Sequence, residues 1–492
     1  MEFTYDSRYR KITATHCTLD ESRNIMKSCS GASVKSMGVV RFDDSLFNRI
    51  ALGIDPPQEI YTGYTINKPF NTKARDYQKE DVTRMVQFRY VLNCNKMGYG
   101  KTFEAIEYCR MLGLKDILVV CPKSVIEQWQ DQFKLWWPDG DYKLSVINYD
   151  KIRMAKILSS YRAALWDIVI CDECHRLKNP KAATTLAVKQ LHSKYRMGLT
   201  GTPILNRPND LWSQLDWLCK DYAGPSYWEF AKFYCDWDIS QFGYQFRGLT
   251  PSNTRKESLS KGLALISVGG TRQAVGSGKQ TIEVGLTLPS ANRKLYNNIK
   301  ELAIEELRNK DINITNAMDQ MLKLQQATSN PTLLDNKLTN PKFEWIHDAV
   351  KDSPDESFVI FSRFAKTVKA LHEYLGDESI CYTGDMTTKQ RDTIKSAFIE
   401  RKKRILIATI GAIGIGVDGL QTVCHNAIFI DRDWSPALNE QAEARLDRMG
   451  QLEQVNVYKL YAKNTIDKYV DSVLRGKLED IEELREWIQY WC

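Results

Sequence analysis

The stretch Met97-Gly98-Tyr99-Gly100-Lys101-Thr102 decides the fold of this chain, because a strand-like run precedes it and a helical pattern follows it. The preceding run, Tyr90-Val91-Leu92, has the apolar character of a buried strand. Glycines in a turn between strand and helix let backbone N–H groups approach a phosphate, while the lysine reaches the outer phosphates and the threonine can hold magnesium. Asn95 stands where the first glycine of such a loop is usual. We therefore predict a phosphate-binding loop formed by Gly98, Gly100, Lys101 and Thr102.

A second apolar run, from Ile168 to Cys171, ends in two adjacent carboxylates, Asp172 and Glu173. One carboxylate at such a strand end can order magnesium through water, and the other can polarise an attacking water. A lone Gly-Lys-Thr could equally be a glycine helix cap followed by a surface lysine, but the carboxylate pair favours a nucleotide site. We predict Asp172 and Glu173 as catalytic groups, and Thr102 and Asp172 as magnesium ligands.

Two arginines far downstream, Arg445 and Arg448, are three residues apart in a stretch with helical character. On a helix this spacing places both guanidinium groups on one face, where they can bracket a γ-phosphate. The alternative is a pair of solvated arginines on an amphipathic helix. Because the charge on a transferred phosphoryl group is stabilised by cations, we predict a catalytic site in two distant pieces that must close to work.

Short apolar runs alternate with amphipathic helical patterns along most of the chain. The runs lie at residues 117–121, 168–171, 358–361, 405–408 and 427–430. This alternation predicts an α/β fold with two parallel sheets. Residues 211–350 have few strand-like runs and long helical patterns, so we expect helical excursions there. We predict an N-terminal accessory region of unknown role at residues 1–66 and a first lobe at 67–262. A hinge or linker rich in glycine and serine follows at 263–283, then a second lobe at 284–475 and a C-terminal helix at 476–492.

The composition agrees with an intracellular protein of several domains. The 492 residues exceed the size at which a single core stops growing. The 68 lysines and arginines outnumber the 61 aspartates and glutamates, a mild excess that suits a polyanionic partner without demonstrating one. The 12 cysteines are scattered, several within apolar runs, which indicates a reducing compartment. The first residues lack a basic stretch followed by an apolar one, and no apolar run approaches about 20 residues, so we expect a soluble protein without a membrane partner.

Taken in order, these segments resemble the Swi/Snf-like branch of helicase superfamily two, over residues 70–475. The segments that carry the resemblance are Asp76-Tyr77-Gln78, Met97 to Thr102, Val120 to Ser124 with Gln128-Trp129, Asp172 to Asn179, Leu199 to Pro203, Phe361-Ser362, Trp434-Ser435-Pro436, Gln441 to Arg445, Arg448 and Gly450-Gln451. The Trp-Ser-Pro segment and the Arg-Met-Gly-Gln segment separate this branch from strand-separating relatives better than the phosphate loop does.

The resemblance implies two RecA-like lobes and a DNA-dependent ATPase that translocates on double-stranded DNA. It implies that Lys101, Thr102, Asp172 and Glu173 bind and hydrolyse ATP with Mg²⁺, that Gln78 reads adenine, and that Arg445 and Arg448 are arginine fingers. Asp418, at the end of a glycine-rich stretch, is assigned to the same nucleotide site. The positions that match the family's backbone-tracking segments are Lys123, Ser124, Thr200, Ser362 and Thr409, whose phosphate contacts carry no sequence information.

Three positions depart from the family pattern. Asn95-Lys96 replaces an acidic pair, Gly269-Gly270 stands where consecutive arginines are often found, and Asp418-Gly419 differs from the usual Asn-Leu. No histone-reading module is recognisable, which favours a compact prokaryotic or viral translocase, monomeric and cytoplasmic rather than nuclear, whose protein partners the sequence does not predict. Two alternatives remain open: a strand-separating or annealing helicase acting on branched DNA or RNA, and a nucleotide-gated nucleic-acid-binding module with weak turnover.

Overall fold

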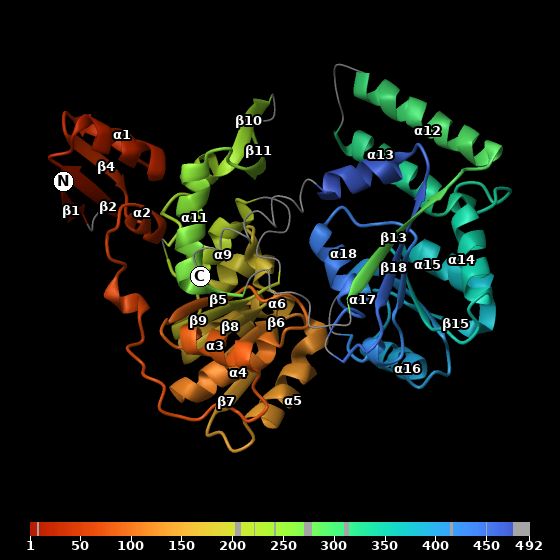
Figure 1. Cartoon of the computed structure of the whole chain (residues 1–492), viewed down its shortest axis with the longest axis horizontal. Coiled ribbons are helices and arrows are strands. Elements are labelled where there is room, and N and C mark those ends of the chain that lie inside the picture. The colour runs from red at the N-terminus through yellow and green to blue at the C-terminus, as the bar shows by residue number, and fades with distance from the viewer. Residues whose placement is uncertain are drawn as a thin grey trace. The chain divides into compact units, whose positions relative to one another are not determined.

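The computed structural model describes residues 1–6, 9–201, 208–220, 222–240, 243–269, 278–308, 314–413, 417–448 and 450–475. The described elements fall into two compact units, with the division between strands β12 and β13 (Figure 1). Each unit contains one six-stranded sheet. The predicted C-terminal helix, at residues 476–492, lies outside the described residues.

The sheet of the first unit has the strand order β12-β5-β9-β8-β6-β7, and all its neighbours are parallel. Its strands are β5 (Tyr90–Asn93), β6 (Asp116–Cys121), β7 (Lys143–Asn148), β8 (Leu165–Asp172), β9 (His192–Leu199) and β12 (Ser267–Val268). The helices that join or flank these strands are α3 (Asp76–Met85), α4 (Lys101–Leu112), α5 (Ile126–Trp136), α6 (Tyr149–Ile152), α7 (Ala155–Ala163), α8 (Ala183–Val188) and α9 (Asp210–Leu218).

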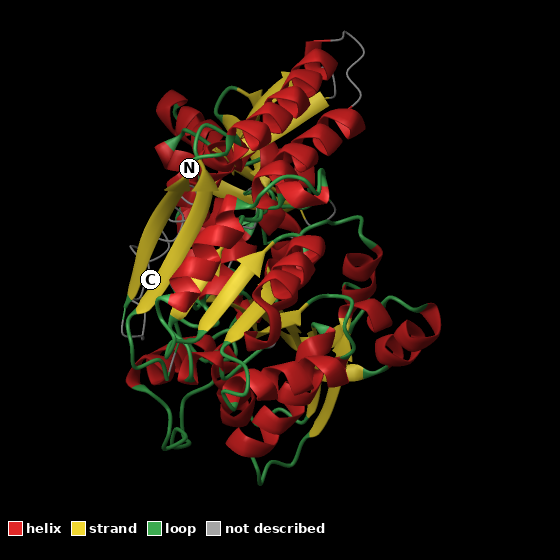
Figure 2. Cartoon of the chain, turned by 90° about the vertical axis from the view of Figure 1, so that its right-hand side faces the viewer, coloured by secondary structure: helices red, strands yellow, loops and turns green. Residues whose placement is uncertain are grey.

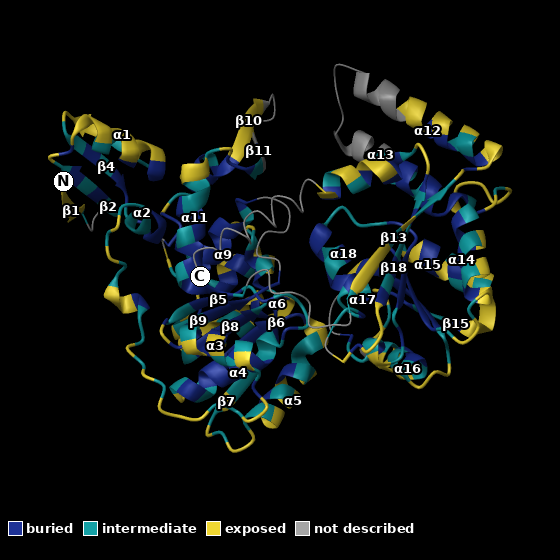
Figure 3. Cartoon of the chain, in the orientation of Figure 1, coloured by how far each residue is buried: buried dark blue, intermediate teal, exposed yellow. Residues whose placement is uncertain are grey.

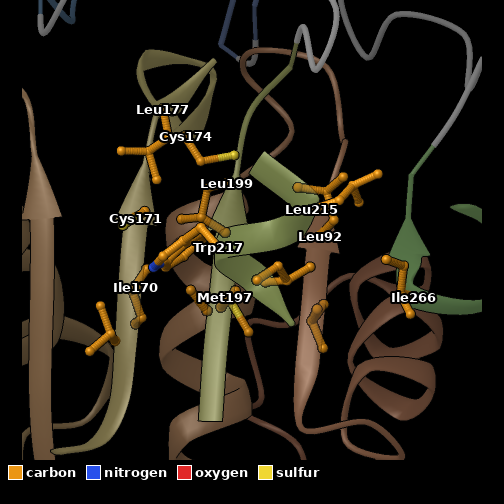
Figure 4. Packing of buried hydrophobic residues seen from close by; sticks show 14 of the residues in the cluster. Leu92, Ile170, Cys171, Cys174, Leu177, Met197, Leu199, Leu215, Trp217 and Ile266 are labelled. Carbon is orange, nitrogen blue, oxygen red and sulfur yellow. The ribbon is translucent and has the colours of Figure 1, made fainter. Parts of the chain in front are cut away.

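The core of this unit forms because its central strands are apolar on both faces. Side chains of β5, β8 and β9 pack with Leu215 and Trp217 of α9 (Figure 4). Near-continuous apolar strands of this kind need helices over both faces, and Figure 2 shows the strands flanked by helices. The carboxyl ends of β5, β9 and β8 therefore lie side by side at one edge of the sheet, where α/β proteins bind ligands.

The N-terminal region is a four-stranded antiparallel sheet with two helices. Its sheet order is β1-β2-β4-β3, with β1 (Glu2–Asp6), β2 (Lys11–Thr15), β3 (Ser33–Ser36), β4 (Val39–Asp43), α1 (Leu19–Ser28) and α2 (Leu46–Ala51). A capping box between Thr18 and Glu21 starts α1. Phe47 of α2 packs edge to face on Tyr234, with ring centroids 6.0 Å apart. These contacts fasten the N-terminal region to helices of the first unit.

The sheet of the second unit has the order β13-β18-β17-β14-β16-β15 and is also entirely parallel. Its strands are β13 (Lys279–Leu286), β14 (Phe358–Ser362), β15 (Ser379–Tyr382), β16 (Ile405–Thr409), β17 (Asn426–Phe429) and β18 (Val455–Ala462). Its helices are α12 (Ser290–Arg308), α13 (Ile314–Ser329), α14 (Pro341–Lys351), α15 (Ala365–Leu375), α16 (Thr388–Ile399), α17 (Ile410–Ile413) and α18 (Pro436–Glu443). The central strands of both sheets are buried, whereas the edge strand β13 and the outer faces of the helices are largely exposed or half-buried (Figure 3).

The predicted α/β fold with two parallel-sheet lobes is confirmed. The excursion after α9 also contains an antiparallel hairpin, β10 (Cys235–Ser240) and β11 (Gly243–Leu249), between α10 (Tyr227–Tyr234) and α11 (Asn253–Ile266). The sequence prediction of a mainly helical excursion missed this hairpin. Among the described residues, no helix has the length and apolar character needed to cross a bilayer.

Regular structure occupies both ends of the predicted linker, 263–283. Helix α11 runs through Gly262 to Ile266, β12 follows it, and β13 begins at Lys279. Just before the predicted linker, a Cβ on Gly262 would lie 1.7 Å from Cδ1 of Phe47. This glycine therefore serves close packing between α11 and α2, rather than chain flexibility.

Candidate nucleotide site

The loop between β5 and α4 has the conformation that its glycines predict. Gly98 and Gly100 adopt positive φ angles of 81° and 79°, and Gly100 is the N-cap of α4. L-residues rarely adopt this backbone conformation. A Cβ on Gly100 would also come within 2.6 Å of Nε2 of Gln78. The loop thus leaves its backbone free of side chains at the amino end of α4, which suits a phosphate.

Lys101, the first residue of α4, points back into this loop. Its Nζ donates to the carbonyl oxygens of Asn95 at 2.8 Å and Lys96 at 3.3 Å. Burial lowers the pKa of the Lys101 ammonium group, and the carboxylates of Glu173 and Asp172 act in the opposite direction. An ammonium group held by loop carbonyls and compensated by two carboxylates is suited to receive an anionic ligand.

The carboxylate of Asp172 lies at the end of β8, and two aromatic residues hold it there. Nε1 of Trp129 donates to Oδ2 of Asp172 at 2.9 Å, and the hydroxyl of Tyr149 donates to its backbone oxygen at 2.7 Å. Burial and the adjacent carboxylate of Glu173 raise the pKa of Asp172. A divalent cation beside Asp172 would stabilise the ionised carboxylate against both burial and the charge of Glu173. Asp172 therefore fits a magnesium site, to which Thr102, in the first turn of α4, could add its hydroxyl.

Glu173 is connected to the end of β9 through an imidazole. Glu173 has a positive φ of 53°, and its Oε2 lies 3.3 Å from Nδ1 of His175. The same Nδ1 lies 3.1 Å from Oγ1 of Thr200. Burial lowers the pKa of His175 to about 3, so the imidazole is neutral at physiological pH. The carboxylate of Glu173, which is predicted to be catalytic, and the hydroxyl of Thr200 therefore lie beside the same uncharged imidazole.

Gln78 and Tyr77, at the start of α3, support the phosphate loop. The hydroxyl of Tyr77 donates to the carbonyl oxygen of Tyr99 at 2.8 Å, and Nε2 of Gln78 contacts the same oxygen at 3.4 Å. Oε1 of Gln78 accepts from the backbone N–H of Arg75 at 3.1 Å. Gln78 thus lies against the loop, and its predicted contact with adenine stays a prediction.

Asn95, the residue that departs from the usual loop pattern, bridges two buried carboxylates. Its Nδ2 donates to Oδ2 of Asp81 at 2.8 Å and to Oε2 of Glu104 at 3.0 Å. All three side chains are buried. Burial and the nearby Asp81 raise the pKa of Glu104 to about 8. An acidic residue at position 95 would add a third carboxylate to this group, whereas an amide donates to both existing ones.

Gly269, the second departure, packs directly on Asn95. The backbone N–H of Cys94 donates to the carbonyl oxygen of Val268 at 2.8 Å, which continues the pairing of β12 with β5. A Cβ on Gly269 would lie 2.5 Å from the backbone nitrogen of Asn95. The segment formed by β12 and Gly269, which leads out of the first unit, therefore packs against the phosphate loop.

Replacing Gly269 by alanine should destabilise the first unit more than replacing Gly278 does. The two glycines have nearly equal φ angles of 95° and 97°, so an alanine should suffer similar backbone strain at either position. Only Gly269 has neighbours in the space of the added methyl group. We expect a further loss of about 1–3 kcal/mol for Gly269→Ala from this overpacking, measured by urea unfolding. Equal losses in the two variants would contradict the packing role.

The two arginines of the second unit do not lie on a helix, contrary to the prediction. Helix α18 ends at Glu443, and Arg445 follows it in tight turns. The backbone N–H of Arg445 donates to Ala442 O and that of Leu446 to Glu443 O, both three residues back. Salt bridges from Lys279 and Lys459 also hold the buried carboxylate of Glu443 at this end. The helical spacing argument was therefore wrong for these residues.

Arg445 and Arg448 still converge, because both contact Asp418. Nη1 of Arg445 lies 3.6 Å from Oδ1 of Asp418, and Nη1 of Arg448 donates to the same oxygen. Burial favours the protonated form of Asp418, but Arg448 and Arg445 outweigh it and hold its pKa below the ordinary value. The arrangement brings two cations to one anion.

The five predicted DNA contacts differ in accessibility. Lys123 and Ser124 are exposed in a single turn after β6. Thr200, Ser362 and Thr409 are buried at the carboxyl ends of β9, β14 and β16. The predicted contacts of these three residues with phosphate stay predictions.

The hydroxyl of Ser362 has an internal partner that the sequence interpretation missed. It donates to Oδ2 of Asp431 at 2.7 Å, and the backbone N–H of Arg363 donates to Oδ1 of the same residue at 2.6 Å. Asp431 comes shortly after the apolar strand β17, and Asp172 is the last residue of the apolar strand β8. The signal used for Asp172 was therefore present for Asp431, whereas nothing in the sequence pointed to Tyr149.

Comparisons with known proteins agree with this arrangement. Three family models match the chain: the SNF2-related domain over residues 139–333, the helicase conserved C-terminal domain over residues 341–450, and the type III restriction enzyme res subunit over residues 71–205. An uncharacterized ATP-dependent helicase of Mycoplasma genitalium is 26% identical over 83% of this chain and 42% of its own length. The ISWI chromatin-remodeling complex ATPase ISW2 of Saccharomyces cerevisiae is 23% identical over 81% of this chain and 40% of its own length.

Among solved structures, the Sulfolobus solfataricus SWI2/SNF2 ATPase core in complex with dsDNA is 24% identical, with a TM-score of 0.39, over 87% of this chain and 96% of that one. The SNF2-related and helicase C-terminal models match consecutive parts of the chain, and the loop with Lys101 precedes the first of them. The chain is therefore similar to SNF2-related helicases in two consecutive segments. It spans about two fifths of the length of the Mycoplasma and yeast relatives.

Proposed function

We propose that this chain couples the hydrolysis of MgATP to translocation on double-stranded DNA. The observation that carries the proposal is the division of the catalytic groups between two sheets. The first unit holds the phosphate loop, Asp172 and Glu173, and the second holds the arginine pair on Asp418. Among the residues that the structure describes, neither unit has a complete set of groups for phosphoryl transfer. Turnover would therefore require closure, and closure is the movement that can drive translocation.

The residues of the first unit bind the nucleotide and position water. The ammonium group of Lys101 leaves the carbonyl oxygens of the loop and contacts the outer phosphates of ATP. Thr102 and Asp172 would hold Mg²⁺. The metal, when bound, neutralises charge on the phosphates. Glu173 orients the attacking water, and its contact with His175 keeps its carboxylate in place. Gln78, whose amide lies against the loop, contacts the adenine.

The arginines of the second unit supply the remaining cations. Arg445 and Arg448 leave Asp418 on closure and stabilise the charge that develops on the transferred phosphoryl group. Exposed Lys123 and Ser124 meet the DNA backbone, and Thr200, Ser362 and Thr409 become accessible only after rearrangement. Contacts of this kind are tolerant of sequence and sensitive to salt.

Duplex DNA should stimulate ATP hydrolysis by the purified chain more strongly than single-stranded DNA or RNA does. The measurement is phosphate release with each nucleic acid and with none, and Lys101→Ala is the blank because it removes the phosphate-binding ammonium group. Stimulation by single strands or RNA would instead favour a strand-separating or annealing helicase. Tight DNA binding without stimulation would favour a nucleotide-gated binding module.

A further inference from the structure

The hairpin β10–β11 presents an exposed aromatic face. We define the aromatic hairpin face as Trp228, Trp237, Ile239 and Tyr244. The exposed fractions of these side chains are 52%, 40%, 63% and 40%. Large apolar side chains gathered in one exposed place usually mark an interaction site. Nothing in the proposed ATPase mechanism uses this face.

The rings of this face are held in position before any partner binds. Trp237 pairs across the strands with Phe246, and Ile239 pairs with Tyr244, so these four side chains share one face of the hairpin. The ring of Tyr244 lies 5.3 Å from that of Trp237 and 6.1 Å from that of Trp228. Buried Phe246 anchors the cluster from below. Preorganised rings lose little entropy on binding a flat partner.

Cationic groups surround the aromatic hairpin face. Nζ of Lys232 lies 4.0 Å from the centre of the Tyr244 ring. A cavity of about 590 Å³ adjoins Trp237, and Lys27 and Arg255 line it together with the hydroxyl side chains of Thr250, Ser252 and Thr254. Asp236 is the one carboxylate among its lining residues in the described part of the chain. The surroundings are therefore suited to an anionic partner with hydrogen-bond acceptors.

We propose that the aromatic hairpin face binds unpaired nucleotides of a single-stranded nucleic acid. Bases stack on Trp237 and Trp228, and the backbone phosphates lie toward Lys232 and the cavity with Lys27 and Arg255. Exposed aromatic rings beside a positive groove are how proteins bind single strands without sequence preference. Paired bases inside a duplex offer no free ring faces. The site therefore selects single strands, and it points to a substrate in which a single strand adjoins the duplex.

The test measures binding without nucleotide, so it does not rest on the proposed ATPase activity. The probe is a short fluorescein-labelled oligothymidine, followed by fluorescence anisotropy with the full chain. Trp237→Leu should weaken binding about tenfold, which corresponds to about 1.4 kcal/mol, the scale of one base–aromatic stack. Trp237→Phe should retain most of the affinity because it keeps a ring. Tyr374→Ala, at an equally exposed tyrosine of the second unit, is the control and should bind as the parent does.

Three results would overturn the proposal. If Trp237→Leu binds oligothymidine as the parent chain does, the face does not bind single strands, and a protein becomes its occupant. If Trp237→Leu and Trp237→Phe lose equal affinity while both keep the parent melting temperature, stacking is not the source of binding. A hairpin-capped duplex should bind all four proteins equally, and selective loss of duplex binding in Trp237→Leu would also contradict selection of single strands.

Discussion

The Glu173→Gln variant should hydrolyse ATP about 10²–10⁴-fold more slowly than the parent chain, because a neutral amide cannot accept a proton from the attacking water. Nucleotide binding should be unchanged, since Lys101 and the glycine loop are intact. The substitution keeps the size of the side chain and an oxygen or nitrogen near Nδ1 of His175, so the fold should also be preserved. The effect should therefore appear in kcat alone.

The measurement for Glu173 is DNA-stimulated phosphate release beside the affinity for a fluorescent ATP analogue. Glu127→Gln is a matched control, because Glu127 is exposed on α5 and takes no part in the site. Substantial turnover by Glu173→Gln would remove Glu173 from its assigned role. Loss of nucleotide binding in the same variant would instead assign it to ground-state binding.

Replacing Arg445 or Arg448 by alanine should reduce stimulated turnover by about 10³–10⁵-fold, the range found when an arginine finger is lost. The second unit holds both guanidinium groups at one carboxylate, Asp418, so we expect neither arginine to replace the other. Binding of ATP to the first unit should be weakened far less than turnover, because the phosphate loop and Lys101 belong to the other sheet.

The control for the arginines is Arg475→Ala. Arg475 is also paired with a carboxylate, that of Glu283, at 3.0 Å, but it is mostly exposed. This variant should hydrolyse ATP at the parent rate. If Arg445→Ala and Arg448→Ala did the same, both residues would be structural partners of Asp418 rather than arginine fingers. A double-mutant cycle would then show whether the two residues act together.

The parts of the site at the ends of buried strands could be predicted from the sequence. A continuous apolar run indicates a buried strand, and the polar residues at its end then lie at the edge of the sheet. This reasoning located the phosphate loop after β5 and Asp172 at the carboxyl end of β8. It failed for Arg445, since helical spacing does not reveal that α18 ends at Glu443. The bridge from Asn95 to Asp81 and Glu104 also escaped prediction, because it joins residues whose proximity only the tertiary structure creates.

Strand β12 is only two residues long, yet it carries the chain out of the first sheet beside the strand that ends in the phosphate loop. Tension on the segment that follows would reach the loop through Gly269 and Asn95 before it disturbed the rest of the sheet. Because the pairing of β12 with β5 is so short, we expect it to be the first part of the sheet to open under tension. ATP binding at the loop would then respond directly to forces that oppose movement of the second unit.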